Sequence, residues 1–146
     1  MSTTVYFSLG TNLGDKEQNL RTAIQQLEQR VGHVLALSSF HATEPWGFTS
    51  CHTFLNAACS VQTDLEVMEV LRVTQQIERE MGRTLKSVDG TYHDRLIDID
   101  LLLCYDADGR SITLQTPELV LPHPLMYQRD FVMRPLREIL PLQMGR

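Results

Sequence analysis

The chain has 146 residues, of which 42% are hydrophobic and 21% charged, a balance that is close to the globular average and argues against a disordered chain and a coiled coil. Its length fits one domain spanning residues 1–146. Acidic residues outnumber basic ones by 18 to 13, which gives a net charge of −5. This acidity argues against a protein whose main task is to hold a nucleic-acid backbone.

The cysteine pattern bears on the cellular compartment. Cys51, Cys59 and Cys104 are odd in number and widely spaced, and none belongs to a CxxC pair. This argues against a disulfide framework and a structural zinc site, and fits a reducing compartment. The N-terminus has no basic leader, and no apolar run approaches the roughly 20 residues of a membrane span. We therefore expect a cytoplasmic protein that has no membrane partner.

Periodicity predicts a strand and a helix in the first part of the chain. The strand covers Thr4–Leu9 and ends in a turn at Gly10–Gly14. Asp15, with Gln18 three residues later, resembles a capping box that opens the helix, and Gly32 is placed to stop it. The helix carries one apolar stripe, made of Leu20, Ala23, Ile24, Leu27 and Val31.

Two strands and a second helix follow. The strands are predicted over about His33–Ala42 and Phe54–Thr63, and Asp64 is placed to cap a helix that ends at Gly82. The polar stretch Arg83–Arg95 indicates an exposed loop.

The last predicted strand, Leu96–Cys104, has the clearest alternation. Two aspartates alternate along it with four apolar residues, Ile97, Ile99, Leu101 and Leu103. A turn at Asp106–Gly109 follows, and one or two short helices are expected around Pro124–Leu140. The order strand, helix, strand, strand, helix, strand predicts a ferredoxin-like α+β fold (βαββαβ) with short C-terminal helices in addition. In this fold both helices cover one face of an antiparallel sheet, which leaves the other face for a site.

Asp98 and Asp100 are the most informative residues. Alternate side chains on a strand share a face, so both carboxylates point the same way, with Cα atoms about 6.6 Å apart. Two such ligands suit Mg²⁺ bound together with substrate phosphates. The alternative is the solvated face of an edge strand, where charges discourage aggregation.

Basic residues flank this strand in sequence, namely Arg83, Lys86, Arg95 and Arg129. Arginine binds phosphate oxygens bidentately, although a surface charge explains any single one of them better. His123, held between two prolines, fits either a donor to a phosphate or a structural turn. No GxxxxGK[ST] and no GxGxxG motif is present. The residues alone therefore indicate a magnesium-dependent, phosphate-handling domain.

Three further residues have ordinary structural explanations at this point. Phe54 and Phe131 are expected in the core, as most phenylalanines are. Asn56 shares the strand parity of Phe54, and its amide needs hydrogen-bond partners if it is buried.

Motifs in a fixed order cover the chain from Val5 to about Pro141. They are Gly10-Thr-Asn-Leu-Gly14, Thr43-Glu-Pro-Trp-Gly47, Phe54-Leu-Asn56, Gln75-Gln-Ile-Glu78 with Gly82-Arg83, Arg95-Leu-Ile-Asp98-Ile-Asp100, and Leu121-Pro-His-Pro124 with Arg129-Asp-Phe131. The ordered set resembles the 6-hydroxymethyl-7,8-dihydropterin pyrophosphokinase family of folate biosynthesis. The resemblance implies transfer of pyrophosphate from ATP to the hydroxymethyl group of the pterin, with release of AMP.

The same resemblance implies a role for individual residues. Asp98 and Asp100 would hold two Mg²⁺ ions and, with Arg83 and Arg95, form the catalytic set. The pterin would contact Thr43, Glu44, Trp46, Phe54, Asn56, Asp98 and Phe131, with the two phenylalanines on its two faces. ATP would contact Gln75, Glu78, Arg83, Tyr92, Arg95, His123 and Arg129. The Arg83–Arg95 loop matches a segment that closes over both substrates.

The chain departs from the family pattern at two places. Tyr92-His93-Asp94-Arg95 stands where many members have Trp-Gly-Pro-Arg, and Glu118-Leu119 lies where an arginine often precedes the Pro-His motif. The magnesium pair and the aromatic pair are retained.

Two other classes of protein fit the same strand order. An RNA-binding module is disfavoured by the pI near 5.5 and by the lack of an Arg/Lys-Gly-Phe/Tyr motif. An effector-binding regulatory domain would leave Asp98 and Asp100 merely solvated. For the pyrophosphokinase we expect ATP and the pterin as partners, no nucleic acid, and a monomer or a homodimer.

Overall fold

The computed structural model describes residues 2–43, 53–82 and 96–140. One antiparallel sheet forms its centre, with the strands in the order β2-β4-β1-β5 and β3 pairing with β4 beyond the end of β2. The strands are β1 (Thr3–Thr11), β2 (His33–Leu37), β3 (His41–Thr43), β4 (Phe54–Thr63) and β5 (Asp98–Tyr105). This order, with β2 and β3 taken as one interrupted strand, is the predicted ferredoxin-like topology.

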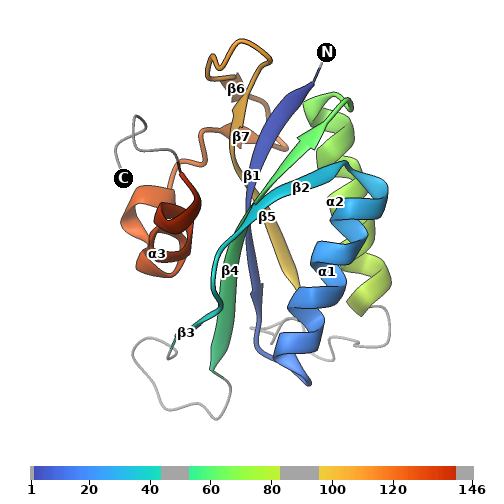
Figure 1. The fold of residues 1–146 in the computed structure, drawn as a ribbon, viewed down its shortest axis with the longest axis vertical. Helices are drawn as coiled ribbons and strands as arrows, with labels where there is room; N and C mark the ends of the chain where they lie inside the picture. Colours follow the sequence, from blue (N-terminus) through green and yellow to red (C-terminus); the bar gives the residue numbers. More distant parts are fainter. Residues whose placement is uncertain (1, 44–52, 83–95, 141–146) are drawn as a thin grey trace.

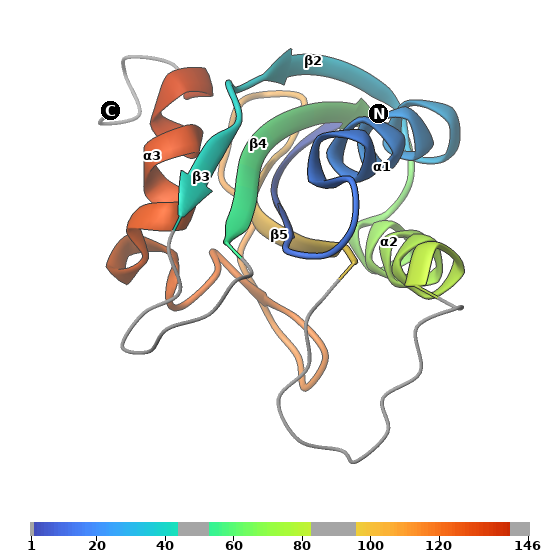
Figure 2. The same ribbon diagram turned by 90° about the horizontal axis from the view of Figure 1, so that it is seen from below.

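Helices cover both faces of this sheet (Figure 1). Two of them, α1 (Lys16–Arg30) and α2 (Val67–Gly82), lie side by side on one face, as predicted. The opposite face carries α3 (Asp130–Ile139), which runs beside β3 and β4 when the molecule is seen from below (Figure 2). The segment between β5 and α3 contains a small hairpin and a 3-10 turn, namely β6 (Leu114–Gln115), β7 (Val120–Leu121) and Met126–Gln128.

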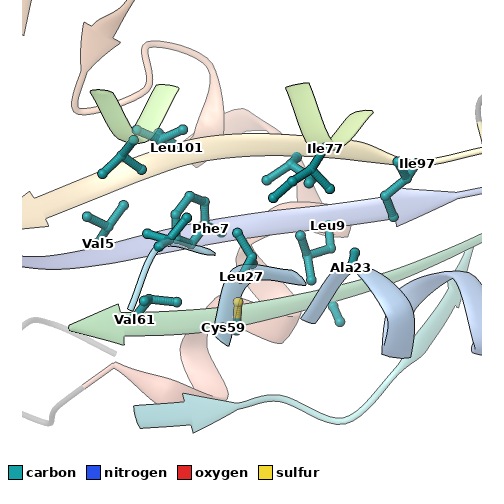
Figure 3. Packing of buried hydrophobic residues seen from close by; sticks show 14 of the residues in the cluster. Val5, Phe7, Leu9, Ala23, Leu27, Cys59, Val61, Ile77, Ile97 and Leu101 are labelled. Carbon is teal, nitrogen blue, oxygen red and sulfur yellow. The ribbon is translucent and has the colours of Figure 1, made fainter. Parts of the chain in front are cut away.

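The main core lies between the sheet and the α1–α2 pair (Figure 3). The predicted inward residues of β1, Val5, Phe7 and Leu9, are all fully buried there. Leu20, Ala23 and Leu27 from the apolar stripe of α1 are fully buried as well. Within the described residues, no helix has both the length and the apolar character to cross a bilayer.

The two predicted helix starts have different outcomes. The Asp15 carboxylate accepts a hydrogen bond from the backbone N–H of Gln18 at 3.1 Å, which confirms the cap of α1. The expectation for Asp64 is wrong, because α2 begins only at Val67 and its first hydrogen bond runs from the N–H of Val70 to the carbonyl of Glu66.

The predicted strand His33–Ala42 is interrupted after Leu37. At the break, the Ser38 side chain accepts a hydrogen bond from the N–H of Ala58 at 2.8 Å, in place of a backbone carbonyl. Ser38 N–H still donates to the Ala58 carbonyl at 2.9 Å. Both backbone groups of Ala58 are therefore bonded at the break, where the chain changes direction before β3.

The face opposite α1 and α2 is only partly open, which corrects the expectation that it is free. A second apolar cluster packs α3 against one part of this face through buried residues that include Tyr6, Ala58, Leu102, Met133 and Leu136. The ladder of β5 shifts its register between Tyr6 and Phe7, so Leu102 is an extra residue. Because of this shift, Leu103 faces α3 and not the main core, where it was expected.

Candidate active site

The open part of the α3-side face contains the residues that the sequence singles out. In the two ladders of β1, Gly10 pairs with Asn56 on one side and with Asp98 on the other. Ser8 likewise pairs with Ala58 and with Asp100. Directly paired residues share a face, so both aspartates project from the same face as Asn56, as alternation along the strand predicts.

Asn56, Gly10 and Asp98 form a row across the sheet, from β4 to β5. At the β4 end of this row, the side chains of Phe54 and Asn56 lie over Gly10. A Cβ atom on Gly10 would lie 2.9 Å from Asn56 Oδ1 and 3.9 Å from Phe54 Cδ1. Gly10 therefore belongs to β1 and keeps room for these two side chains, whereas the sequence places it in the turn. The positive φ of 64° occurs at Gly14.

Asn56 is 6% exposed and has the partner that its burial requires. Its Nδ2 donates to the Thr43 hydroxyl at 2.5 Å, which joins β4 to β3 within the site. The start of β4 is also tied to α1, because Lys16 Nζ donates to the Thr53 carbonyl at 3.0 Å. These bonds fix the backbone on both sides of Phe54.

At the β5 end, a cavity of about 330 Å³ lies between α2, β5 and the β6–β7 hairpin. Its walls include four residues from the predicted ATP and metal sets, Gln75, Glu78, Asp100 and His123. Apolar walls come from Leu71, Leu119 and Val120. The combination of apolar walls and a few polar groups is typical of a small-molecule site.

His123 is held by bonds on both its backbone and its ring. Its N–H donates to the carbonyl of Leu102, the extra residue of β5, at 2.9 Å. Its Nδ1 accepts from the N–H of Leu125 at 3.2 Å, so the proton of the neutral ring resides on Nε2. Partial burial lowers the pKa of His123; the Asp100 carboxylate opposes this shift, and the Arg129 guanidinium adds to it. His123 can therefore donate from Nε2 while neutral.

Glu78 reaches the strand that carries the two aspartates. Its Oε2 accepts a hydrogen bond of 2.7 Å from the backbone N–H of Ile99, the residue between Asp98 and Asp100. β5 is an edge strand, so no further strand lies on its outer side to accept a hydrogen bond from this N–H. A side chain of α2 accepts it instead. Glu78 thereby fixes the backbone from which both carboxylates project.

The aspartate pair fits Mg²⁺ in its donor chemistry. Asp100 is exposed and Asp98 is half-buried, and both supply hard carboxylate oxygens on one face of β5. Among the described residues, no group of three or more His, Cys, Asp or Glu side chains is able to hold a metal ion. Two carboxylates beside a cavity suit Mg²⁺, which commonly takes its other ligands from water and substrate phosphates.

Phe54 and Phe131 are both half-buried. Phe131 packs against the second apolar cluster, in line with its expected place in the core, whereas Phe54 belongs to neither core cluster, which corrects the expectation for Phe54. Phe54 begins β4, and Phe131 lies in the first turn of α3. The Arg129 guanidinium lies over the Phe131 ring, 5.7 Å from its centroid, so a residue of the predicted ATP set contacts one of the predicted pterin set.

Five predicted site residues lie outside the described part of the chain. They are Glu44, Trp46, Arg83, Tyr92 and Arg95. The cavity also has walls that the sequence analysis did not assign, above all Leu71 and Leu119. Apolar residues on a helix and a hairpin give no sign in the sequence that they line a cavity. The close approach at Gly10 did have such a sign, because it is a glycine that follows directly on an alternating strand.

The fold and the paired carboxylates define a ferredoxin-like domain with a site suited to phosphate chemistry. The model of a family described as 7,8-dihydro-6-hydroxymethylpterin-pyrophosphokinase matches residues 6–141. The chain belongs to this family of enzymes, which are diphosphotransferases.

Two relatives agree with this family, and a solved structure has the same fold. A 2-amino-4-hydroxy-6-hydroxymethyldihydropteridine pyrophosphokinase of Porphyromonas gingivalis is 52% identical over 139 residues, which are 94% of this chain and 90% of that protein. The protein of the same name from Bacillus subtilis is 40% identical over 140 residues, 95% of this chain and 79% of its own. The crystal structure of Plasmodium falciparum HPPK-DHPS has a TM-score of 0.71 at 16% identity over 97% of this chain. This chain spans 41% of that structure, and the likeness is one of fold.

Proposed function

We propose that the protein transfers the pyrophosphoryl group of ATP to the hydroxymethyl group of 6-hydroxymethyl-7,8-dihydropterin in folate biosynthesis, with Mg²⁺ as cofactor. The hydroxymethyl oxygen forms a bond to the β-phosphorus. The bond from that phosphorus to the oxygen bridging to the α-phosphorus breaks, AMP leaves with this oxygen, and the hydroxyl proton is lost. The main support is the aspartate pair beside a cavity lined by Gln75, Glu78 and His123, in a chain of this family.

The two substrates occupy different ends of the row across the sheet. ATP lies in the cavity, where the neutral His123 donates from Nε2 to a phosphate oxygen. Gln75, Glu78 and Arg129 complete the ATP side together with Arg83, Tyr92 and Arg95. The carboxylates of Asp98 and Asp100 would hold two Mg²⁺ ions beside the polyphosphate. Mg²⁺ held there would supply positive charge to the phosphates and lower the pKa of the attacking hydroxyl group.

The pterin lies at the β4 end, between the rings of Phe54 and Phe131. Asn56 and Thr43 present an amide and a hydroxyl group to its polar edge, and Glu44, Trp46 and Asp98 complete the contacts. Stacking of a flat ring on an aromatic side chain contributes about 1–3 kcal/mol. This arrangement directs the hydroxymethyl group toward the aspartates, because Asp98 lies across Gly10 from Asn56.

The proposal includes the rest of the chain and its compartment. Residues 1–146 form one pyrophosphokinase domain that acts in the cytoplasm. A reducing compartment agrees with the buried, free thiols of Cys59 and Cys104, whose pKa burial raises to about 12. Thiols with such a pKa stay protonated and inert at neutral pH.

The test is the release of AMP from ATP by the purified protein, with and without 6-hydroxymethyl-7,8-dihydropterin. We expect AMP only when the pterin and Mg²⁺ are both present, and none after chelation with EDTA. Release of AMP without the pterin would identify hydrolysis as the activity. No AMP from folded protein under any of these conditions would refute the proposal.

Replacement of Gly10 by alanine is expected to weaken pterin binding selectively. The added Cβ atom would lie 2.9 Å from Asn56 Oδ1, so the amide has to move away from its position over Gly10. We expect the KM for the pterin to rise by roughly tenfold, within the range for a displaced polar contact, while the KM for ATP changes less than about twofold. Steady-state kinetics with each substrate varied in turn measures both constants. Equal effects on the two KM values would contradict the position of the pterin over Gly10.

A further inference from the structure

Three side chains outside the proposed substrate contacts join α3 to the chain that leads into β3. Glu138, near the C-terminal end of α3, accepts hydrogen bonds through Oε1 from the N–H of Ser39 at 2.7 Å and from its hydroxyl at 2.9 Å. Its Oε2 lies 2.5 Å from His41 Nε2. We call Ser39, His41 and Glu138 the Glu138 clamp.

The clamp depends on the break between β2 and β3. In a continuous strand, the N–H of Ser39 would keep the direction set by the neighbouring residues of that strand. Here Ser38 bonds to both backbone groups of Ala58 in β4, with its side chain and its own N–H. Ser39 is thereby free to turn its N–H and hydroxyl toward α3. The interruption that the sequence pattern missed is what supplies the donors of the clamp.

The Glu138 carboxylate has more partners than an ordinary surface ion pair provides. A single exposed pair contributes little to stability, and the side chain of Glu138 is 37% exposed. Here, however, one carboxylate receives a backbone N–H, a hydroxyl and an imidazole from a chain segment about 100 residues away in sequence. Hydrogen bonds from the Ser39 backbone and side chain lower the pKa of Glu138, so the carboxylate is ionised at neutral pH.

The clamp connects the two elements that carry the proposed pterin contacts. In the ladder, His41 pairs with Asn56 and Thr43 pairs with Phe54, so β3 and the start of β4 form one unit. The other element is α3, which has Phe131 in its first turn and Glu138 two turns later. The spacing of the two rings therefore depends on how α3 docks against β3 and β4.

We infer that the Glu138 clamp is a positioning device for the pterin: it fixes α3, with Phe131, at the separation from β3 and β4 at which a flat ring fits between Phe131 and Phe54. Ser39, His41 and Glu138 act through other residues and need not contact a substrate. The inference rests on the proposed function, since it specifies how one of the two substrate positions is built.

The test compares pterin and ATP binding in Glu138→Ala and in the wild-type protein. Loss of the carboxylate releases Ser39 and His41 from α3 and lets the helix shift on its apolar contacts. We expect the dissociation constant of 6-hydroxymethyl-7,8-dihydropterin to rise by about tenfold, because one of its two aromatic stacking contacts is weakened. The dissociation constant of Mg²⁺–ATP and the kcat at saturating pterin should stay within about twofold of wild type, because the cavity lies at the other end of the row.

Two further variants separate positioning from general damage. Glu138→Gln keeps an oxygen that accepts from the Ser39 N–H and should restore part of the pterin affinity, which also provides a folded variant if Glu138→Ala does not fold. Glu69→Ala breaks the exposed Glu69–Arg72 pair on α2, across the sheet from α3, and should alter neither affinity.

The outcomes distinguish this inference from the function itself. A wild-type protein that binds no pterin refutes the proposed function, and the inference falls with it. A wild-type protein that binds the pterin, with Glu138 variants that bind it equally well, refutes the inference alone. Parallel losses of pterin and ATP affinity in Glu138→Gln also refute it, because they indicate a general disturbance of the fold.

Discussion

Replacement of Asp100 by asparagine is expected to lower kcat by roughly 10³-fold, the size of effect that follows loss of a group stabilising transition-state charge. The side chain is exposed and projects into the cavity that we assign to ATP. Asparagine keeps the shape of the side chain but removes the negative charge that a magnesium ligand needs. Asp98→Asn should have an effect of the same order, since Asp98 lies on the same face of β5.

Folding should be almost unaffected by the change at Asp100. An exposed substitution alters the free energy of unfolding by less than about 0.5 kcal/mol, so loss of activity reports on chemistry. AMP release and Mg²⁺-dependent ATP binding by calorimetry are the measurements, with Asp108→Asn as a matched control. Asp108 is exposed in the turn after β5, and its neutralisation should change neither quantity. Turnover retained in a folded Asp98 or Asp100 variant would exclude the pair as the metal ligands.

The sequence predicts the central strands well because their burial imposes a period of two. The strand Phe54–Thr63 has the predicted bounds, and Val5, Phe7 and Leu9 all face the main core. The shared face of Asp98 and Asp100 follows from the same period, and their partners Gly10 and Ser8 confirm it. Much of the site is therefore predictable from local sequence.

The errors arise where contacts from distant parts of the chain override the local period. At Leu103, one extra residue in β5 turns the side chain to the opposite face of the sheet. The sequence does not reveal this turn, because α3 covers the opposite face and an apolar residue fits there as well. At Ser38, the break depends on hydrogen bonds to β4, twenty residues away. The wall residue Leu119 belongs to a hairpin whose position is set by tertiary packing.

Gly32 follows the end of α1, as predicted, and its N–H donates to the Leu27 carbonyl at 3.1 Å, but the reason for a glycine at this position is different. A glycine that stops a helix commonly has positive φ, but among the described glycines only Gly14 and Gly109 do. A Cβ atom on Gly32 would lie 2.0 Å from the carbonyl oxygen of Gln62 and 3.0 Å from Thr63 Cα. The glycine is thus required by the close approach of the chain after α1 to β4.

Gly32→Ala is therefore expected to reduce the free energy of unfolding by about 3 kcal/mol, the upper end of the usual cost of overpacking. The backbone of β4 cannot easily move away, because Gln62 pairs with Thr4 on one side and His33 on the other. The Thr63 hydroxyl also donates to the Val31 carbonyl at 2.6 Å, which holds the two segments together. Unfolding in urea, compared with the wild-type protein, measures the loss.

Gly82→Ala provides the control, since its added Cβ atom meets no described atom within 4 Å. At the last residue of α2, alanine should leave the protein equally stable or stabilise it by up to about 1 kcal/mol. Gly32 lies against Gln62, near the C-terminal end of β4 and about 26 Å along the strand from Phe54. Folded Gly32→Ala should therefore keep wild-type KM values for both substrates. If Gly32→Ala were as stable as the wild-type protein, the chain after α1 would lie farther from β4 than the 2.0 Å contact implies.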